Sequence, residues 1–178
     1  MKKILLLLAL TYFLVNFTCA QSTEVYREKV FRLNLINPGI EYEYAFLSKS
    51  TVLFNIGVGY GGSYPNLTKG ASGWLYVITP FIDIQYRYYY NLNRRIEKGK
   101  NINYNSGDFF GFRSLSRGED FDSNFTRSSE YDFAFGPIWG LQRSFYKINF
   151  LFDIGVIYYL DTIGNCGIIP MLELSISY

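Results

Sequence analysis

Apolar and polar residues alternate along most of this chain, and the alternation is clearest near its end, from Cys166 to Tyr178. One parity of this stretch carries Ile168, Pro170, Leu172, Leu174, Ile176 and Tyr178, whereas the other carries Met171, Glu173, Ser175 and Ser177. A period of two predicts a β-strand with one apolar face. A protein core or a lipid bilayer must cover that face.

The same period recurs in seven earlier stretches, so the pattern predicts eight strands. Their expected ranges are 29–36, 39–47, 51–61, 74–90, 106–116, 129–143, 147–160 and 168–178. An even number of antiparallel strands returns both ends of the chain to the same side, as bacterial outer-membrane barrels require. The last strand is expected to close the barrel against residues 31–36.

The apolar parity changes at Asn37-Pro38-Gly39, which predicts a hairpin between the first two strands. In that hairpin Leu35 would lie opposite Ile40 and Arg32 opposite Glu43. The alternative is one long strand with a β-bulge.

Aromatic residues are sorted along the fourth stretch. Its apolar parity reads Trp74, Tyr76, Ile78, Pro80, Ile82, Ile84, Tyr86, Tyr88 and Tyr90. Aromatic side chains therefore lie at both ends and aliphatic ones in the middle, which is typical of a strand that crosses a bilayer.

The opposite parity of the strands carries polar residues, which we expect to face the inside of the barrel. They are Arg32, Asn34, Glu41, Glu43, Asn55, Asp83, Gln85, Arg87, Glu130, Asp132, Gln142, Asn149, Asp153 and Glu173. Eight strands leave room only for side chains, so these residues should form a network that fills the lumen. Because carboxylates outnumber arginines, some should be protonated, hydrated or paired with Arg113. We expect Arg32 and Arg87 to be structural counter-ions, whose replacement by Met lowers thermal stability.

Three segments are less clear. The faces of residues 107–115 cannot be assigned, because Phe109, Phe110 and Phe112 occupy both parities. The basic segment 91–105 is read as a solvated turn or short helix, with phosphate binding as the alternative. Residues 117–128 are read as a charged loop whose acidic residues lack the spacing of a calcium site.

The N-terminus predicts a secretory signal peptide over residues 1–20, which leaves the barrel domain 21–178. Two lysines precede an apolar run from Ile4 to Val15. Small residues at Thr18 and Ala20 then mark a cleavage site for signal peptidase after Ala20. The apolar run is short for a membrane anchor. Lipidation at Cys19 is a further alternative.

Composition excludes several classes of function. Removal of Lys2 and Lys3 with the signal peptide leaves 15 basic and 15 acidic residues, so there is no electrostatic case for nucleic-acid binding. Cys166 is then the one cysteine left, so no internal disulfide can form. No later segment is long and apolar enough for a membrane helix, so membrane insertion would require a closed barrel. The chain has no His, the commonest general base and metal ligand.

Three segments carry a family resemblance: FRLNLINPGIEYEYAFLSKSTVLFNIGVGYG, YYYNLNRRIEKGKNINYNSGDF and LELSISY. The chain resembles the small outer-membrane β-barrel proteins common in Bacteroidota. The resemblance implies that Leu172, Leu174, Ile176 and Tyr178 are recognised by the barrel-assembly machinery. It also implies that Asp161-Thr162-Ile163 is similar to a short O-glycosylation motif.

The sequence predicts no catalytic, cofactor-binding or metal site. Lipid A deacylases and palmitoyltransferases resemble this architecture but depend on a catalytic His. The expected function is therefore non-enzymatic: an integral outer-membrane barrel with a structural or loop-mediated surface role, in contact with outer-membrane lipid and lipopolysaccharide. The alternatives are a porin-like conduit for small solutes or ions and a soluble periplasmic lipid-binding barrel.

Overall fold

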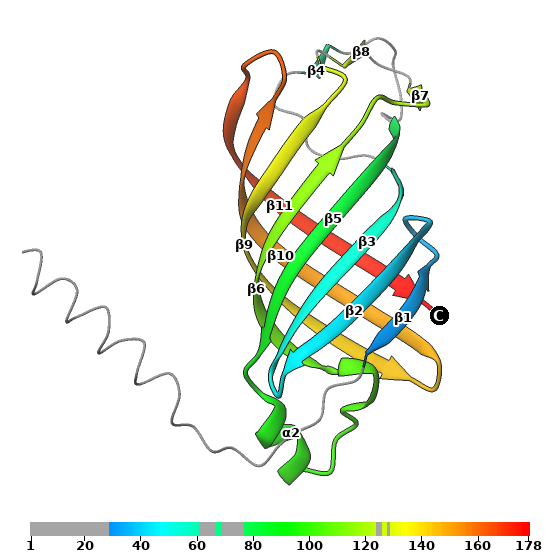
Figure 1. Cartoon of the computed structure of the whole chain (residues 1–178), viewed down its shortest axis with the longest axis vertical. Helices are drawn as coiled ribbons and strands as arrows, with labels where there is room; N and C mark the ends of the chain where they lie inside the picture. Colours follow the sequence, from blue (N-terminus) through cyan, green and yellow to red (C-terminus); the bar gives the residue numbers. More distant parts are fainter. Residues whose placement is uncertain (1–28, 61–66, 69–76, 124–125, 128) are drawn as a thin grey trace, which may run out of the picture.

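The computed structural model describes residues 29–60, 67–68, 77–123, 126–127 and 129–178 (Figure 1). The predicted signal peptide lies outside the described residues, as do Trp74 and Tyr76. In the part that the structure describes, no helix is both long and apolar enough to cross a membrane.

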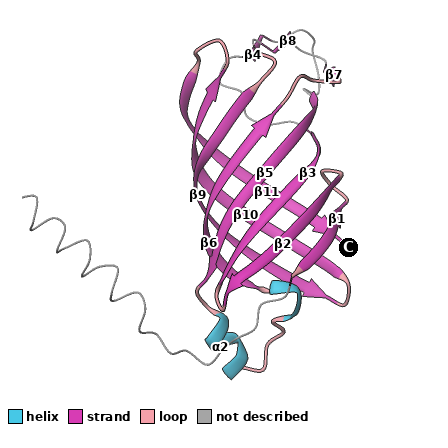
Figure 2. Ribbon diagram, in the orientation of Figure 1, coloured by secondary structure: helices cyan, strands magenta, loops and turns pink. Residues whose placement is uncertain are grey.

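Eight long strands form one closed antiparallel ring (Figure 2). They are β1 (Val30–Asn34), β2 (Gly39–Leu47), β3 (Ser50–Tyr60), β5 (Val77–Tyr89), β6 (Gly107–Arg117), β9 (Asp132–Phe145), β10 (Ile148–Asp161) and β11 (Cys166–Ser177). Each pairs with its neighbours in chain order, and β1 pairs with β11. The number and antiparallel arrangement of the predicted strands are confirmed.

Closure of the ring joins the first strand to the last, as predicted. Asn34 lies opposite Ser177, and the backbone N–H groups of Leu33 and Leu35 donate to the carbonyls of Tyr178 and Ile176, both at 2.8 Å. The ring therefore leaves no open edge between its two terminal strands.

The first hairpin is confirmed, but its predicted register is wrong. Arg32 lies opposite Glu41, not Glu43, and the chain turns at residues 35–38. On the other side of β2, in its pairing with β3, Gly39 lies opposite Gly57, where a Cβ on Gly57 would lie 2.3 Å from the Pro38 carbonyl oxygen. Two glycines allow this close approach of backbones.

Several strands begin or end one to three residues away from the predicted positions. Tight turns, rather than the apolar pattern, determine where the hydrogen bonding between strands stops. Strand β9 begins at Asp132 and continues to Phe145, where a two-residue turn leads to Ile148. Within that turn Tyr146 has a φ of 54° and is 96% exposed.

The structure assigns the faces of β6. Phe109 and Arg113 are buried inside the ring, whereas Phe110 and Phe112 are exposed outside it. Phe109 obscured the pattern because it is an apolar residue on the inner, mostly polar parity.

The connection between β5 and β6 lies at one end of the ring and contains the helix α2 (Leu92–Glu97) and the 3₁₀ turn η1 (Asn103–Asn105) (Figure 1). The short-helix interpretation of the basic segment is therefore correct. At the opposite end, β7 (Asp122–Ser123) pairs with β5, and β8 (Thr126–Arg127) pairs with β4 (Leu67–Thr68). The sequence predicted only a loop over 117–128.

Candidate functional site

The inside of the ring is the candidate site, because most of the buried side chains there are polar or charged. Among the described residues, 25 polar or charged residues are buried, against 12 hydrophobic ones. The buried set includes twelve of the predicted interior residues: Arg32, Asn34, Glu41, Glu43, Asn55, Asp83, Gln85, Arg87, Asp132, Gln142, Asn149 and Asp153. Glu173 also points inward, with a side chain 10% exposed. Glu130 is a wrong prediction, because it precedes β9 and is exposed.

Arg32 is held by carboxylates near the α2 end. Its guanidinium forms ion pairs with Glu41 and with Glu43, the second at 2.9 Å. Glu43 Oε1 also accepts hydrogen bonds from the hydroxyls of Thr51 and Tyr89, each at 2.7 Å. These residues come from β1, β2, β3 and β5, so the cluster ties four strands together.

Arg87 lies inside the ring but is bound differently from what the sequence suggested. Its Nε donates to Gln85 Oε1 at 2.8 Å and its Nη1 to Gln142 Oε1 at 2.9 Å. The guanidinium also lies over the Phe109 ring, 4.6 Å from its centroid. Two amides and an aromatic face therefore hold this arginine directly, and no ion pair within 4 Å is found for it among the described residues.

Arg113 is the main counter-ion of the interior. Its Nε and Nη2 bind the two oxygens of Asp83 at 2.9 and 2.6 Å. Its Nη1 lies 3.4 Å from Asp153 Oδ1 and 2.5 Å from Glu173 Oε2. One arginine on β6 thus connects β5, β10 and β11 across the ring, and the expected pairing of carboxylates with Arg113 is confirmed.

A continuous path of hydrogen bonds joins these clusters. Gln85 Nε2 donates to Asp83 at 2.7 Å, and Gln85 also accepts from Arg87. Arg87 leads to Gln142, whose Nε2 lies 3.5 Å from Glu43. A connected network of this kind rigidifies the interior, although Arg32 Nε, Arg87 Nη2 and Asp153 Oδ2 have no hydrogen-bond partner among the described residues.

A second arginine pair at the loop end was missed by the sequence reasoning. Arg117 Nε donates to Asp132 Oδ1 at 2.7 Å, and Arg127 Nη2 donates to Asp132 Oδ2 at 3.0 Å. Arg127 also binds the Gly118 carbonyl at 2.8 Å. The signal for Arg117 was its parity, which it shares with Arg113, whereas nothing in the pattern pointed to Arg127.

Apolar side chains close the interior at the α2 end. Tyr89, Leu92, Phe109 and Leu151 are buried together with Ile138 in one cluster, and Ile102 packs against it. We call Tyr89, Leu92, Phe109 and Leu151 the plug. Leu92 reaches it from α2, so the helix covers this end of the ring (Figure 1).

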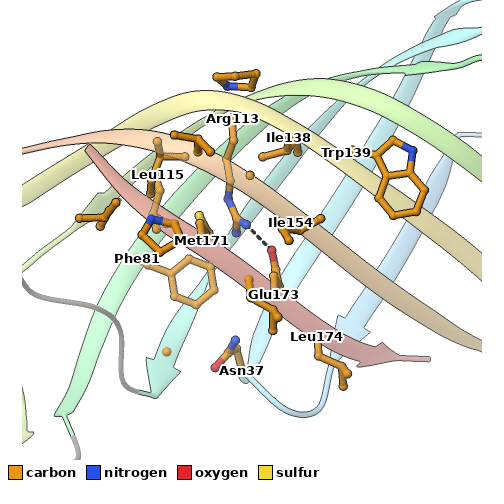
Figure 3. A pocket seen from close by; sticks show the side chains of 18 of the residues that line it. Asn37, Phe81, Arg113, Leu115, Ile138, Trp139, Ile154, Met171, Glu173 and Leu174 are labelled. Carbon is orange, nitrogen blue, oxygen red and sulfur yellow. Dashed lines mark ion pairs between the residues drawn. The ribbon is translucent and has the colours of Figure 1, made fainter. Parts of the chain in front are cut away.

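Toward the loop end the interior is hollow. A pocket of about 940 Å³ is lined by the inner residues Phe81, Leu115, Ile138 and Met171, and the Arg113 to Glu173 ion pair reaches into it (Figure 3). The same pocket extends to outward-facing residues, among them Phe110, Ile154 and Leu172, so its volume is only partly inside the ring. The cavity combines apolar walls with one charged pair, which is typical of sites for small amphipathic molecules.

The described residues contain no group of three His, Cys, Asp or Glu side chains that could hold a metal ion. The arginines and carboxylates of the interior cross-link strands through hydrogen bonds and ion pairs. Comparison with known proteins matches no family model, no curated protein and no solved structure.

Proposed function

We propose that this protein is an integral outer-membrane β-barrel, exported by a signal peptide cleaved after Ala20, with a non-enzymatic structural or loop-mediated role. The observation that carries the proposal is the inverted burial of the ring. Polar residues are enclosed and large apolar residues are exposed along the same strands. A soluble barrel has the opposite arrangement, whereas alternation with the apolar side outward is the pattern of outer-membrane barrels.

The exposed wall is large and continuous. On β11 alone, Ile168 is 74% exposed, Leu172 66% and Leu174 51%. Ile154 on the neighbouring β10 and Ile56 on β3 are also exposed. Soluble monomers rarely expose contiguous apolar patches beyond a few hundred Å², so lipid is the solvent that best fits this wall.

Aromatic residues favour the ends of the wall. On β5, Tyr86 and Tyr88 lie toward the α2 end and Ile82 and Ile84 nearer the middle. At the other end, the ring of Tyr158 on β10 packs 5.6 Å from that of Phe135 on β9. Amphipathic rings favour the headgroup region, so this arrangement supports a bilayer position.

The contents of the ring favour a filled lumen over a conduit. The cavity at the loop end gives the porin-like alternative some support, since it would admit a small solute. The plug and the charged group around Arg32, Glu41 and Glu43 occupy the rest of the interior, however. Leu92 and Phe109 of the plug are completely buried. Conduction would require these side chains to move.

Three partners follow from the proposal. Outer-membrane lipid and lipopolysaccharide would surround the wall, and the barrel-assembly machinery would recognise β11. The outward positions Leu172, Leu174, Ile176 and Tyr178 support the latter, because they form an apolar series that ends in an aromatic residue. Membership of the small barrel proteins of Bacteroidota belongs to the same proposal.

A mobility comparison tests membrane integration. Residues 21–178 refolded in detergent should migrate faster on a detergent gel before boiling than after it, because a closed barrel stays folded until heated. A single mobility, or extraction of the native protein from cells without detergent, would contradict the proposal and favour the soluble alternative.

Conductance separates the filled barrel from the conduit. Protein reconstituted in planar bilayers should give no reproducible current steps. Stable channels of one size would show that solutes pass the plug.

A further inference from the structure

A basic pocket lies outside the ring's interior. It is formed where α2 meets the start of β6 and the end of β9. Its volume is about 290 Å³. Five cationic side chains line it: Arg94, Arg95, Lys98, Lys100 and Arg143. The one carboxylate in its lining is Asp108. The pocket therefore has a strong excess of positive charge.

Asp108 is already engaged by protein groups. It forms an ion pair with Arg143 and accepts a hydrogen bond from Asn91 Nδ2 at 2.5 Å. Glu97, on the same helix, is exposed and does not line the pocket. The remaining four cations thus have no carboxylate within the pocket to neutralise them.

Arg95 gives the pocket a buried, fixed cation. The residue is 9% exposed, its Nη2 donates to the Asn101 carbonyl at 2.6 Å, and its buried Nε has no hydrogen-bond partner among the described residues. Burial, and then the neighbouring charge of Arg143, lower the pKa of Arg95 from its ordinary value. Because Arg95 lines the pocket and is held there by the Asn101 carbonyl, its fixed charge adds to the positive field that an anion would meet.

The pocket adjoins the exposed aromatic wall. Tyr90 lines it, and the Tyr90 ring lies 4.9 Å from that of Phe110. The Tyr90 hydroxyl also accepts a hydrogen bond from Trp139 Nε1 at 3.0 Å. A ligand held by the cations would therefore have its other end beside apolar side chains that face away from the ring.

We propose that this pocket binds the phosphate group of an anionic phospholipid, whose acyl chains lie along the wall beside Tyr90 and Phe110. Arginine guanidinium groups bind phosphate oxygens in pairs, and lysines add charge. The volume suits a headgroup better than a larger ligand. The inference rests on the proposed function, because it needs Tyr90 at the bilayer surface.

Quenching of Trp139 fluorescence by brominated lipid tests the proposal. Residues 21–178 carrying Trp74→Phe, so that Trp139 is the remaining tryptophan, are reconstituted in phosphatidylcholine bilayers. A small fraction of the lipid is then brominated phosphatidylglycerol or, in a parallel sample, brominated phosphatidylcholine. Phosphatidylglycerol should quench Trp139 much more strongly at equal mole fraction.

Charge variants identify the site. The pair Arg94→Gln and Lys98→Gln removes two cations that would each bond the phosphate directly, at about 1 kcal/mol each, and should weaken the relative association of phosphatidylglycerol about thirty-fold. The matched pair Lys49→Gln and Lys147→Gln removes two cations from turns at the same end and should change it less than about three-fold. If both pairs weaken phosphatidylglycerol association equally, general surface charge rather than the pocket attracts the lipid, and the proposal is wrong.

Further measurements separate failure of the lipid site from failure of the proposed function. If brominated phosphatidylglycerol shows no preference while inorganic phosphate at millimolar concentration still changes Trp139 fluorescence in phosphatidylcholine bilayers, the pocket binds free anions and the lipid assignment is wrong. Protein that enters bilayers with the expected heat-dependent mobility but shows no preference contradicts this inference alone. Protein that does not enter bilayers contradicts the proposed function as well.

Discussion

The two faces of β5 differ completely, although their residues alternate along one strand. On the inner face, Asp83, Gln85 and Arg87 are at most 1% exposed. On the outer face, Ile82 and Ile84 are 52% and 41% exposed. The inner side chains bind one another and other strands, whereas the outer aliphatic ones face away from the protein.

The difference shows where this fold obtains its stability. Inside, each charged group depends on a partner from another strand, so loss of one partner leaves a buried charge uncompensated. Outside, the side chains depend on the surrounding solvent, and lipid is the solvent in which they would be stable. The following variants test the two faces separately, from the largest expected effect to the smallest.

Replacement of Arg113 by Met should have the largest effect. It leaves Asp83, Asp153 and Glu173 without their shared cation, so the free energy of unfolding should fall by about 3–5 kcal/mol. Urea titration of the protein in lipid, followed by tryptophan fluorescence, measures it. Arg143→Met is the control, because that ion pair with Asp108 is partly exposed and should contribute less than about 1 kcal/mol. Equal losses for the two variants would contradict the role assigned to the inner network.

Replacement of Ile84 by Lys tests the solvent of the outer face. Ile84 lies opposite Ser114 in the ladder, in the aliphatic part of the wall. A lysine at the middle of a bilayer should lower the free energy of unfolding by about 2–4 kcal/mol. Ile84→Leu is the control and should change it little. A lysine variant as stable as the parent would indicate that water, not lipid, contacts this wall.

Replacement of Arg87 by Met should cost less than that of Arg113. Arg87 donates to Gln85 and Gln142, so the expected loss is about 1.5–3 kcal/mol, the range for hydrogen bonds to a charged group. A double-mutant cycle with Gln142→Leu should show that the two residues are coupled. If the losses of the two single variants simply add in the double variant, the hydrogen bond between Arg87 and Gln142 does not contribute to stability.

Replacement of Ser114 by Val should have the smallest effect, and its sign is opposite. Ser114 is an exposed polar residue of the outer face of β6, so the change should stabilise the protein in lipid by up to about 1 kcal/mol. Ser175→Val is the inner-face counterpart. Ser175 is buried and lies 3.3 Å from Asn34 Oδ1, so that variant should be less stable. The same sign for both variants would mean that the faces do not differ in solvent.

The period of the sequence was sufficient to predict the eight strands and, outside residues 107–115 and Glu130, the residues that share a face. It could not determine the register of the first hairpin, because shifting the register by two residues leaves every side chain on the same face. The observed register follows from a four-residue turn at 35–38 with Asn34 opposite Gly39, whereas the predicted register needed a two-residue turn.

The candidate site was predicted in composition but not in connectivity. Arg87 and Arg113 both belong to the inner face by parity, yet Arg113 binds three carboxylates and Arg87 binds amides. Partners across a ring come from strands far apart in sequence, so alternation along one strand carries no information about them. The plug was missed for a related reason, since Phe109 and Leu151 are apolar residues on the polar parity.

By itself, the sequence determined that eight strands of period two have one apolar and one polar face, because side-chain direction in a strand is local. The tertiary structure alone decided the register of the first hairpin and which inner side chains meet across the ring. It also decided which end the plug fills and which end is hollow. Those features depend on strand register and on side chains meeting across the ring, and both are set by contacts between residues distant in the chain.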